Sequence, residues 1–176
     1  MVHDRNMPTN PDSGMASRDR ESQADLLLRV ELESNPEALC LVRAMVERAT
    51  EVLQFPESES RAVVRSVDEA LTNVIRHAYK GRAGHTIEVT CRRLRHVDNG
   101  ASVVGIEIVL EDAGEPFEPE KLQGRSLDEL RPGGLGLHFI RQSMDKVEFR
   151  REKGKNQLRL VKYLAPVAPV KSPQGE

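Results

Sequence analysis

Three groups of residues in this sequence could do chemistry, and the first lies in the segment DEALTNVIRHAY. There Glu69, Asn73 and His77 follow one another at intervals of four residues. On an α-helix this spacing stacks the side chains along one stripe. A carboxylate and a carboxamide one turn apart can hold a divalent ion between protein and phosphate oxygens. The alternative is a solvated helix face on which E-x-x-x-N is incidental, and His77 alone is typical of a structural residue.

The second group lies in EDAGEPFEP, directly after an apolar run that is typical of a strand. Asp112 stands at the end of that strand, where its carboxylate can accept a hydrogen bond from an exocyclic amine such as that of adenine. Gly114 has no β-carbon, so its backbone can approach a flat ring closely. These residues indicate a base-binding turn. The alternative is an ordinary D-x-G turn.

The third group is RPGGLGLHFIRQSMD, in which Gly133, Gly134 and Gly136 lead into a predicted helix. Free backbone N–H groups and the helix dipole converge at such a helix start, and this arrangement binds phosphate. The segment lacks the Lys-Ser/Thr pair that ends a P-loop, which excludes a Walker-type site. No long apolar strand of a βαβ unit precedes it, which argues against a Rossmann site. The alternative is a flexible hinge before the helix.

The elements that must position these residues can be predicted from periodicity. Branched residues favour a first strand at residues 26–32. Ser34 or Asn35 can then cap a helix with Pro36 in its first turn, and apolar residues recur at helical spacing as far as residue 53. A second helix is predicted to begin near Ser58, because acidic residues in its first turn complement the helix dipole.

The second helix is predicted to end at Lys80 and Gly81. Alternating residues from 87 to 94 then indicate a strand, and the turn signal at residues 98–100 pairs it with the next strand as an antiparallel hairpin. Residues 112–134 are long for a connection, which is typical of a functional lid.

A third helix is predicted at residues 135–144, followed by strands at 147–151 and 157–164 with Gly154 in the turn between them. The order of elements is therefore β-α-α-β-β-lid-α-β-β. It predicts an α+β two-layer sandwich, in which a mainly antiparallel sheet is covered by helices on one face.

Composition places limits on the partners. The chain has 176 residues, only 3% of them aromatic, so one domain with an aliphatic core is expected. Charged residues make up 31%, yet the formal net charge is −2, which gives no electrostatic basis for nucleic acid or anionic membrane binding. No apolar run approaches the roughly 20 residues of a membrane span, and the polar first residues do not resemble a signal peptide, so we expect a cytoplasmic protein.

The two cysteines, Cys40 and Cys91, form no C-x-x-C, and we expect both to be reduced, buried thiols. Residues 1–23 carry almost nothing to bury, and residues 165–176 alternate Pro with small residues. We therefore expect a disordered N-terminal arm, an ordered domain at residues 24–164, and a disordered Pro-rich tail.

In their order along the chain, the three groups resemble the motifs of the GHKL ATPase superfamily, which includes gyrase, heat-shock chaperone, histidine kinase and mismatch-repair proteins. Within it the chain is similar to the anti-sigma factor serine/threonine kinases of bacterial stress and sporulation regulation. DEALTNVIRHAY resembles their N-box, EDAGEPFEP their first glycine box, RPGGLGLHFIRQSMDKVEF their second, and RLVKYL their last strand. The resemblance covers residues 26–164 and implies a histidine-kinase-like, Bergerat-type ATP-binding domain.

The resemblance implies a role for each matched residue. Asn73 would coordinate a Mg²⁺ ion that bridges the phosphates, and Glu69 would be the catalytic base or would orient the attacking hydroxyl. Asp112 would bind the adenine amino group, and Gly114 would let the ring approach. The other candidate nucleotide-binding residues are His77, Arg131, Gly133, Gly134, Leu135 and Gly136.

Two points stay open within the resemblance. Arg131 or Lys121 could supply a positive charge near the γ-phosphate, and the sequence does not choose between them. Several relatives carry Thr near the adenine in the last strand, where this chain has Arg159 and the three residues that follow it.

The function implied is that of an ATP- and Mg²⁺-dependent regulatory serine/threonine kinase. It would phosphorylate a small antagonist (anti-anti-sigma) protein and sequester a sigma factor, and relatives are often homodimers through the first strand. The alternative is a nucleotide-dependent protein-binding switch that transfers no phosphate. The presence of both Glu69 and Asn73 argues against that alternative.

Overall fold

The structure is a computed structural model that describes residues 23–98, 101–116 and 135–164. Its described strands form one antiparallel sheet in the order β1-β2-β3-β5-β4, so that β1 and β4 are the edges. The strands are β1 (Gln23–Glu33), β2 (Thr86–Asp98), β3 (Ala101–Asp112), β4 (Lys146–Glu152) and β5 (Lys155–Tyr163).

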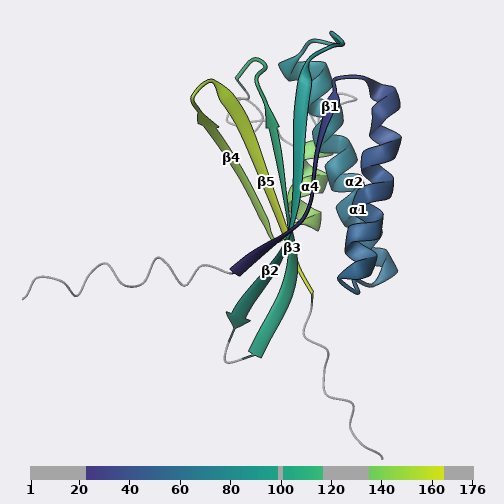
Figure 1. The fold of residues 1–176 in the computed structure, drawn as a ribbon, viewed down its shortest axis with the longest axis vertical. Coiled ribbons are helices and arrows are strands. Elements are labelled where there is room, and N and C mark those ends of the chain that lie inside the picture. Colours follow the sequence, from purple (N-terminus) through teal and green to yellow (C-terminus); the bar gives the residue numbers. More distant parts are fainter. Residues whose placement is uncertain (1–22, 99–100, 117–134, 165–176) are drawn as a thin grey trace, which may run out of the picture.

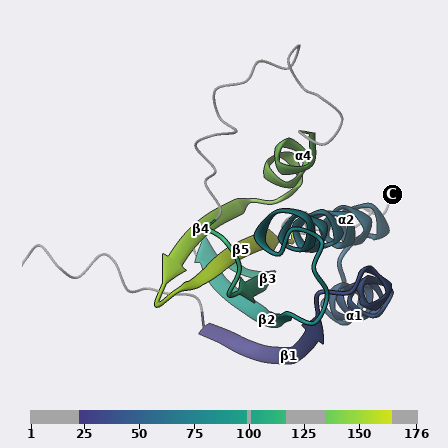
Figure 2. The same cartoon turned by 90° about the horizontal axis from the view of Figure 1, so that it is seen from above.

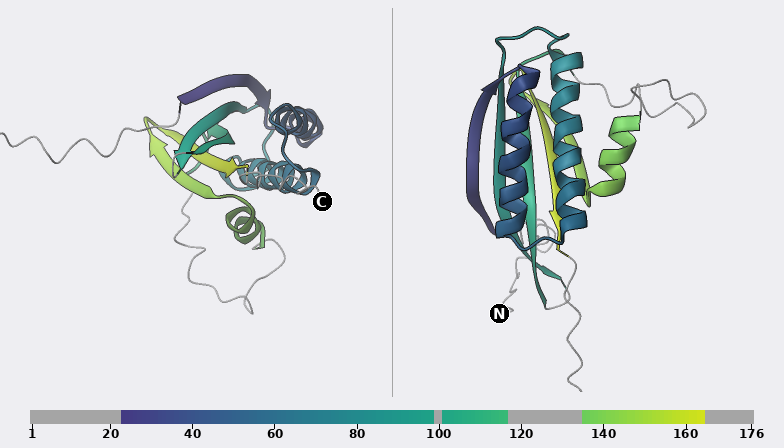
Figure 3. Two further views of the ribbon diagram at one scale, coloured as in Figure 1. Left: turned by 90° about the horizontal axis from the view of Figure 1, so that it is seen from below. Right: turned by 90° about the vertical axis from the view of Figure 1, so that its right-hand side faces the viewer.

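The described helices cover one face of this sheet. They are the 3-10 turn η1 (Pro36–Ala38), α1 (Leu39–Val52), α2 (Glu57–Asn73), the π-helical turn η2 (Val74–Ala78) and α4 (Leu135–Ser143). Figures 1 and 3 show α1, α2 and α4 on the same side of the sheet, and the view from above in Figure 2 shows α2 between the other two. The predicted α+β two-layer arrangement is therefore confirmed.

The end of β1 leads into the first helix through two polar residues. Asn35 caps the 3-10 turn η1, which leads into α1, because its side-chain oxygen accepts a hydrogen bond from Glu37 N at 3.0 Å. Ser34, the other predicted cap, is buried instead. Its hydroxyl donates to Arg82 O at 2.8 Å and accepts from His85 N at 3.1 Å. Ser34 therefore ties the end of β1 to the loop that precedes β2.

The second helix differs from its prediction at its carboxyl end. The α-helix stops at Asn73, and the π-helical turn η2 follows it. Lys80 and Gly81 then adopt positive φ angles of 55° and 73°, which ends helical structure at the predicted place. Apolar periodicity could not reveal the π-helical turn, because the buried residues Leu71, Ile75 and Ala78 keep a spacing that an α-helix also satisfies.

The strand predictions are confirmed, with longer strands than the patterns indicated. Asp98 and Ala101 pair at the tip of the β2–β3 hairpin, and β3 ends at Asp112, whose partner on β5 is Asn156. The turn between β4 and β5 contains Gly154 with φ of 83°, a conformation that favours glycine.

The core lies between the sheet and the helices and is aliphatic, as the low aromatic content predicts. Side chains alternate along each strand, so every second residue points to the helices. The largest fully buried side chains of this core include Val46, Val63, Val67, Leu71, Ile87, Val89, Ile106, Ile108, Leu110, Ile140 and Leu160. Cys91 belongs to the same core, but Cys40 is exposed, which corrects the prediction that both thiols are buried. It lies on the outward face of α1, where a cysteine is accommodated without burial.

On the helix-free face of the sheet, a buried carboxylate is neutralised by two arginines. Glu107 is 7% exposed and accepts hydrogen bonds from Arg159 Nε at 2.6 Å and Arg92 Nη1 at 3.0 Å. Arg159 alternates with the core residues Leu158 and Leu160, so it points away from the helices. In the β3–β5 register Arg159 pairs with Val109, whereas Asp112 pairs with Asn156, so the segment that begins at Arg159 is not the part of β5 beside Asp112.

Gln23, the last residue of the predicted N-terminal arm, instead begins β1, because it pairs with Arg95 of β2. The rest of the predicted arms and most of the predicted lid lie outside the described residues. None of the helices that the structure describes combines the length and the apolar character needed to cross a lipid bilayer.

Candidate nucleotide-binding site

The start of α4 lies directly against Glu69 of α2. A β-carbon added to Gly136 would stand 2.6 Å from Glu69 Cγ and closer still to the carboxylate. A second contact joins the same two helices, since the Arg65 guanidinium lies 4.2 Å from the centre of the Phe139 ring. Two of the three predicted groups, the helix with the carboxylate and the glycine-opened helix start, are thus adjacent in space.

Glu69 and Asn73 are half-buried and lie one turn apart in the last turns of α2, whereas His77 is exposed. The π-helical turn η2 begins directly after Asn73, and a π-helix has more residues per turn than an α-helix. The regular stripe predicted from the four-residue spacing therefore does not continue to His77. Glu69 and Asn73 form a polar pair in the last turns of α2, and Glu69 of this pair faces the start of α4.

The turn at Ala113, Gly114 and Glu115, called here the first glycine turn, packs against η2. A β-carbon on Gly114 would stand 2.6 Å from Ala78 Cβ and 2.7 Å from Ala78 O, so no larger residue fits without movement of the backbone. Glu115 N donates to the same carbonyl at 3.0 Å, and its carboxylate forms an ion pair with Lys80. The second predicted group, EDAGEPFEP, is therefore docked through Gly114 and Glu115 on the helical segment that follows Asn73.

The Asp112 carboxylate is buried at this junction, with 6% of the residue exposed. Its Oδ1 accepts hydrogen bonds from Gly114 N at 2.8 Å and from Asn156 Nδ2 at 2.7 Å. Its Oδ2 accepts no hydrogen bond from any residue that the structure describes. One carboxylate oxygen is thus held by the protein and the other remains available to a donor.

Tyr79 fixes the backbone beside Asp112. Its hydroxyl donates to Thr86 O at 2.7 Å and accepts from Ala113 N at 3.0 Å, and its ring stacks on His85 at a centroid distance of 4.5 Å. Burial raises the pKa of the Tyr79 hydroxyl, so it stays protonated and can donate. A cavity of about 370 Å³ opens beside this turn and is lined by Tyr79, His85 and Gly114, among others.

The arrangement of a polar helix, a carboxylate turn and a glycine-opened helix has counterparts in known proteins. The sequence profile of the histidine kinase-like ATPase domain matches residues 32–162. The chain belongs to this family. It is accordingly an ATP-binding domain, which is the character that the three groups of residues predicted.

Relatives of this histidine kinase-like ATPase domain include several named kinases. "Serine-protein kinase RsbW" of Bacillus pumilus (strain SAFR-032) is 29% identical over 136 residues, covering 73% of this chain and 80% of the relative. The protein of the same name from Bacillus subtilis (strain 168) is 23% identical over 145 residues, covering 78% and 85%. "Serine/threonine-protein kinase BtrW" of Bordetella bronchiseptica is 31% identical over 103 residues, covering 56% and 67%.

Some residues predicted for the site of this ATPase domain lie outside the described residues, namely Lys121, Arg131, Gly133 and Gly134. Leu135 is the first residue of α4. The structure therefore describes the predicted phosphate-binding segment from Leu135 onward.

Sequence reasoning missed Asn156 of this ATPase domain. Asn156 is 7% exposed and bonds to Asp112, whereas the resemblance pointed to Arg159 and the three residues after it in the same strand. Alternation from the core residues Leu158 and Leu160 would have placed Asn156 on the helix side. Its pairing with Asp112 depends on the β3–β5 register, which no local pattern reveals.

Proposed function

We propose that this chain is an ATP-dependent protein serine/threonine kinase of the anti-sigma-factor type. It phosphorylates a small antagonist protein and sequesters a sigma factor when that antagonist is absent, and it acts in the cytoplasm. The contact between Glu69 and Gly136 carries the proposal, because it puts a carboxylate beside a helix start that can bind phosphate. The names of the relatives, which are serine-protein kinases, support the same reaction.

In this reaction the oxygen of a serine hydroxyl forms a bond to the γ-phosphorus of ATP, while the bond from that phosphorus to the β–γ bridging oxygen breaks and ADP leaves. Glu69 takes up the serine proton or orients the hydroxyl. Backbone N–H groups at the glycine-opened start of α4 bind the phosphate oxygens. Asp112 accepts a hydrogen bond from the adenine amino group, and Gly114 lets the base approach the backbone.

The Asn73 carboxamide of α2 suits a Mg²⁺ ion that would arrive with the nucleotide. No group of three or more His, Cys, Asp or Glu side chains in the described part of the chain could hold a metal ion. Mg²⁺ bound to ATP usually takes only one or two protein oxygens, the rest coming from phosphates and water. The half-buried Asn73 carboxamide, one turn from Glu69, supplies such an oxygen. The ion would neutralise phosphate charge.

The experiment is a phosphotransfer assay with γ-labelled ATP and a candidate antagonist protein encoded by a neighbouring gene. We expect label on a serine of the antagonist. Glu69→Ala should abolish transfer while ATP is still bound, because the variant lacks only the group that acts on the hydroxyl. The matched control is Glu47→Ala, which removes an exposed carboxylate from α1.

If the unaltered chain bound ATP tightly but transferred no phosphate, the proposed kinase activity would be wrong. A nucleotide-dependent protein-binding switch would then be favoured. Transfer that survives Glu69→Ala at full rate would overturn the role of Glu69. Asn73→Ala should weaken nucleotide binding in the presence of Mg²⁺ and have little effect in EDTA. Equal weakening under both conditions would argue against a metal role for Asn73.

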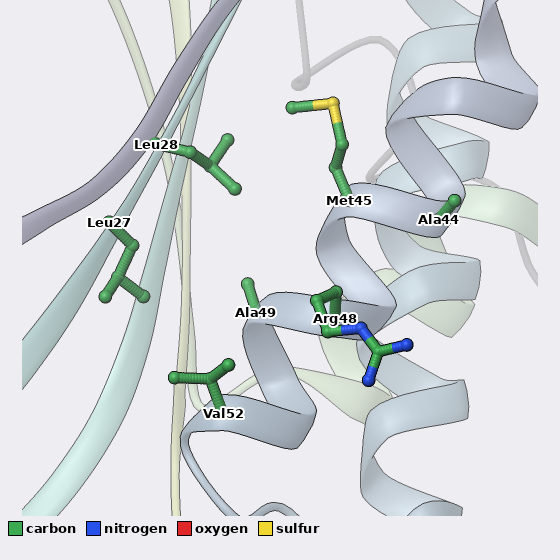
Figure 4. Close-up of a pocket in the computed structure, with 7 residues that line it drawn as sticks. All are labelled: Leu27, Leu28, Ala44, Met45, Arg48, Ala49 and Val52. Atoms are coloured by element: carbon green, nitrogen blue, oxygen red, sulfur yellow. The ribbon is translucent and has the colours of Figure 1, made fainter.

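We also propose that two copies associate through β1. This edge strand has no partner on its outer side among the described strands. An apolar groove of about 400 Å³ lies between β1 and α1, and Figure 4 shows Leu27, Leu28, Met45 and Val52 among the side chains around it. Such an uncovered strand and groove offer both backbone hydrogen bonds and apolar surface to a second strand.

Antiparallel pairing of β1 with its copy, centred on Leu27, would place Asp25 opposite Arg29 of the second copy, a favourable cross-strand pair. Light scattering coupled to size exclusion should give a dimer for the unaltered chain. Leu26→Asp should give a monomer, since Leu26 is 62% exposed on this strand. The control Leu41→Asp changes a similarly exposed leucine that lies on α1 and not on the edge strand. A monomeric unaltered chain would exclude the dimer.

A further inference from the structure

Three side chains from three adjacent strands meet at the end of the sheet. Asn156 of β5 lies opposite Asp112 of β3, and Arg151 of β4 lies opposite Asn156. Asp112 and Asn156 are 6% and 7% exposed, so both polar groups have been removed from water. Groups buried in this way need hydrogen-bond partners, which makes the pattern of bonds between them informative.

The surroundings of Asn156 permit one orientation of its amide. Nδ2 donates to Asp112 Oδ1 at 2.7 Å and to Glu115 O at 2.9 Å, and both of these oxygens are acceptors. The amide oxygen accepts from Arg151 Nη1, and a guanidinium can only donate. A flipped amide would turn its oxygen toward two acceptors and its NH₂ toward a donor. The cost of leaving these buried groups unpaired holds the amide in one state.

Arg151 also connects this group to the first glycine turn. Its Nη1 donates to Gly114 O at 3.2 Å, while Gly114 N donates to Asp112 Oδ1 at 2.8 Å. Asp112 Oδ1 thus has two donors, from Gly114 and Asn156, and its carboxylate cannot rotate without breaking both bonds. Only Oδ2 remains for a ligand, and its direction is set by the bonds to Oδ1.

We propose that Asn156 and Arg151 are positioning residues that make Asp112 select the nucleobase. The fixed acceptor at Asp112 Oδ2 favours a base with an exocyclic amine and disfavours one with a carbonyl at that place. A site built to bind an amine rejects an analogue without it, because Asp112 Oδ2, once covered by the base, then has no partner. This inference rests on the proposed function, since it takes the base of the nucleotide to lie at Asp112.

The test compares nucleotides that differ only in the base. Dissociation constants of the full chain are measured calorimetrically for ATP, GTP and purine riboside triphosphate, which lacks the 6-amino group. The unaltered chain should prefer ATP to the other two. In Asn156→Ala the preference for ATP over purine riboside triphosphate should fall roughly tenfold, the loss expected for one misdirected hydrogen bond to a charged group. The affinity for purine riboside triphosphate itself should stay within about twofold.

Arg151→Gln should reduce the same preference less, because the amide of Asn156 loses its orienting donor but remains present. Arg151 is exposed, so this variant carries the test if Asn156→Ala does not fold. The matched control is Arg150→Gln, the next residue of β4, which bonds Glu148 at 3.4 Å on the opposite face of the sheet. It should leave the preference unchanged.

Three outcomes would overturn the inference. An unchanged preference in both Asn156→Ala and Arg151→Gln would mean that Asp112 needs no positioning. If Asn156→Ala weakened the binding of all three nucleotides equally, Asn156 would have a structural role only. Failure of the unaltered chain to bind any of the nucleotides would instead remove the proposed function, and the inference with it.

Discussion

Gly136 at the start of α4 and Glu69 on α2 are so close that a β-carbon on Gly136 would stand 2.6 Å from Glu69 Cγ. The colliding atoms belong to a flexible side chain, so Gly136→Ala should displace the Glu69 carboxylate and leave the helices in place. Alanine also favours helix over glycine by about 1 kcal/mol. We expect phosphotransfer to fall on the order of a hundredfold, as for a misplaced catalytic group, with no loss of thermal stability.

The control for this variant is His138→Ala, which changes an exposed residue of the same helix. It should keep its activity and its melting temperature. If Gly136→Ala retained full transfer, the Glu69 carboxylate would not act from the position that the structure gives it.

Gly114 meets backbone atoms, so its replacement should have a different result. A β-carbon there would stand 2.7 Å from Ala78 O, and neither the turn nor η2 can yield without losing the bond from Glu115 N. Gly114→Ala should lower the free energy of unfolding by about 1–3 kcal/mol, the usual range for overpacking. It should also weaken ATP binding, which is measured calorimetrically at a temperature where the variant is folded.

Gly105→Ala is the matched control for that prediction. Its β-carbon would stand 2.7 Å from Tyr163 Cδ1 and 2.8 Å from Lys162 O, a similar clash on the helix-free face of the sheet. It should destabilise the protein to a comparable extent and leave the affinity for ATP unchanged. Equal loss of ATP affinity in both variants would assign the effect to stability alone.

The sheet and its helices could be predicted from the sequence because each signal is local. Alternation predicts β2 and β3, the turn signal in the sequence at residues 98–100 predicts that they pair, and Asn35 is a predicted cap that the structure confirms. The order of elements then leaves few ways to bury the apolar faces. The lengths of the strands could be predicted less well from the sequence, because pairing with a neighbour extends a strand beyond its apolar residues.

The parts of the site that could not be predicted depend on longer-range geometry. The π-helical turn after Asn73 keeps the apolar spacing of an α-helix. The four-residue spacing therefore predicted, wrongly, that the stripe of Glu69 and Asn73 extends to His77. Asn156 enters the site through the β3–β5 register, which follows from the whole sheet. Cys40 was expected to be buried because it lies among apolar residues, but it falls on the exposed side of α1.

The two thiols should differ strongly in reactivity. The thiolate is the reactive form, and burial raises the pKa of Cys91 to about 12, whereas Cys40 is exposed. At pH 8 a thiol reagent such as Ellman's reagent should modify one cysteine quickly. Cys40→Ser should remove this fast phase, leaving a slow reaction that follows unfolding. A fast phase that persists in Cys40→Ser would show that Cys91 is accessible and that the core between β2 and the helices opens.

The ion pairs of Glu107 predict how stability depends on pH. Burial raises the pKa of this carboxyl, but the hydrogen bonds from Arg159 and Arg92 outweigh it, and the pKa lies below its ordinary value in the folded protein. The ionised form therefore stabilises the fold above the unfolded pKa of about 4.3, and this contribution is lost as the pH falls through the folded pKa. Glu107→Gln, followed by urea unfolding, should lose about 2 kcal/mol at pH 7 and less at pH 3. The control Glu31→Gln removes an exposed carboxylate of β1 and should leave the free energy of unfolding unchanged at both pH values. If Glu107→Gln lost the same free energy of unfolding at pH 7 and pH 3, packing and not charge would explain the loss.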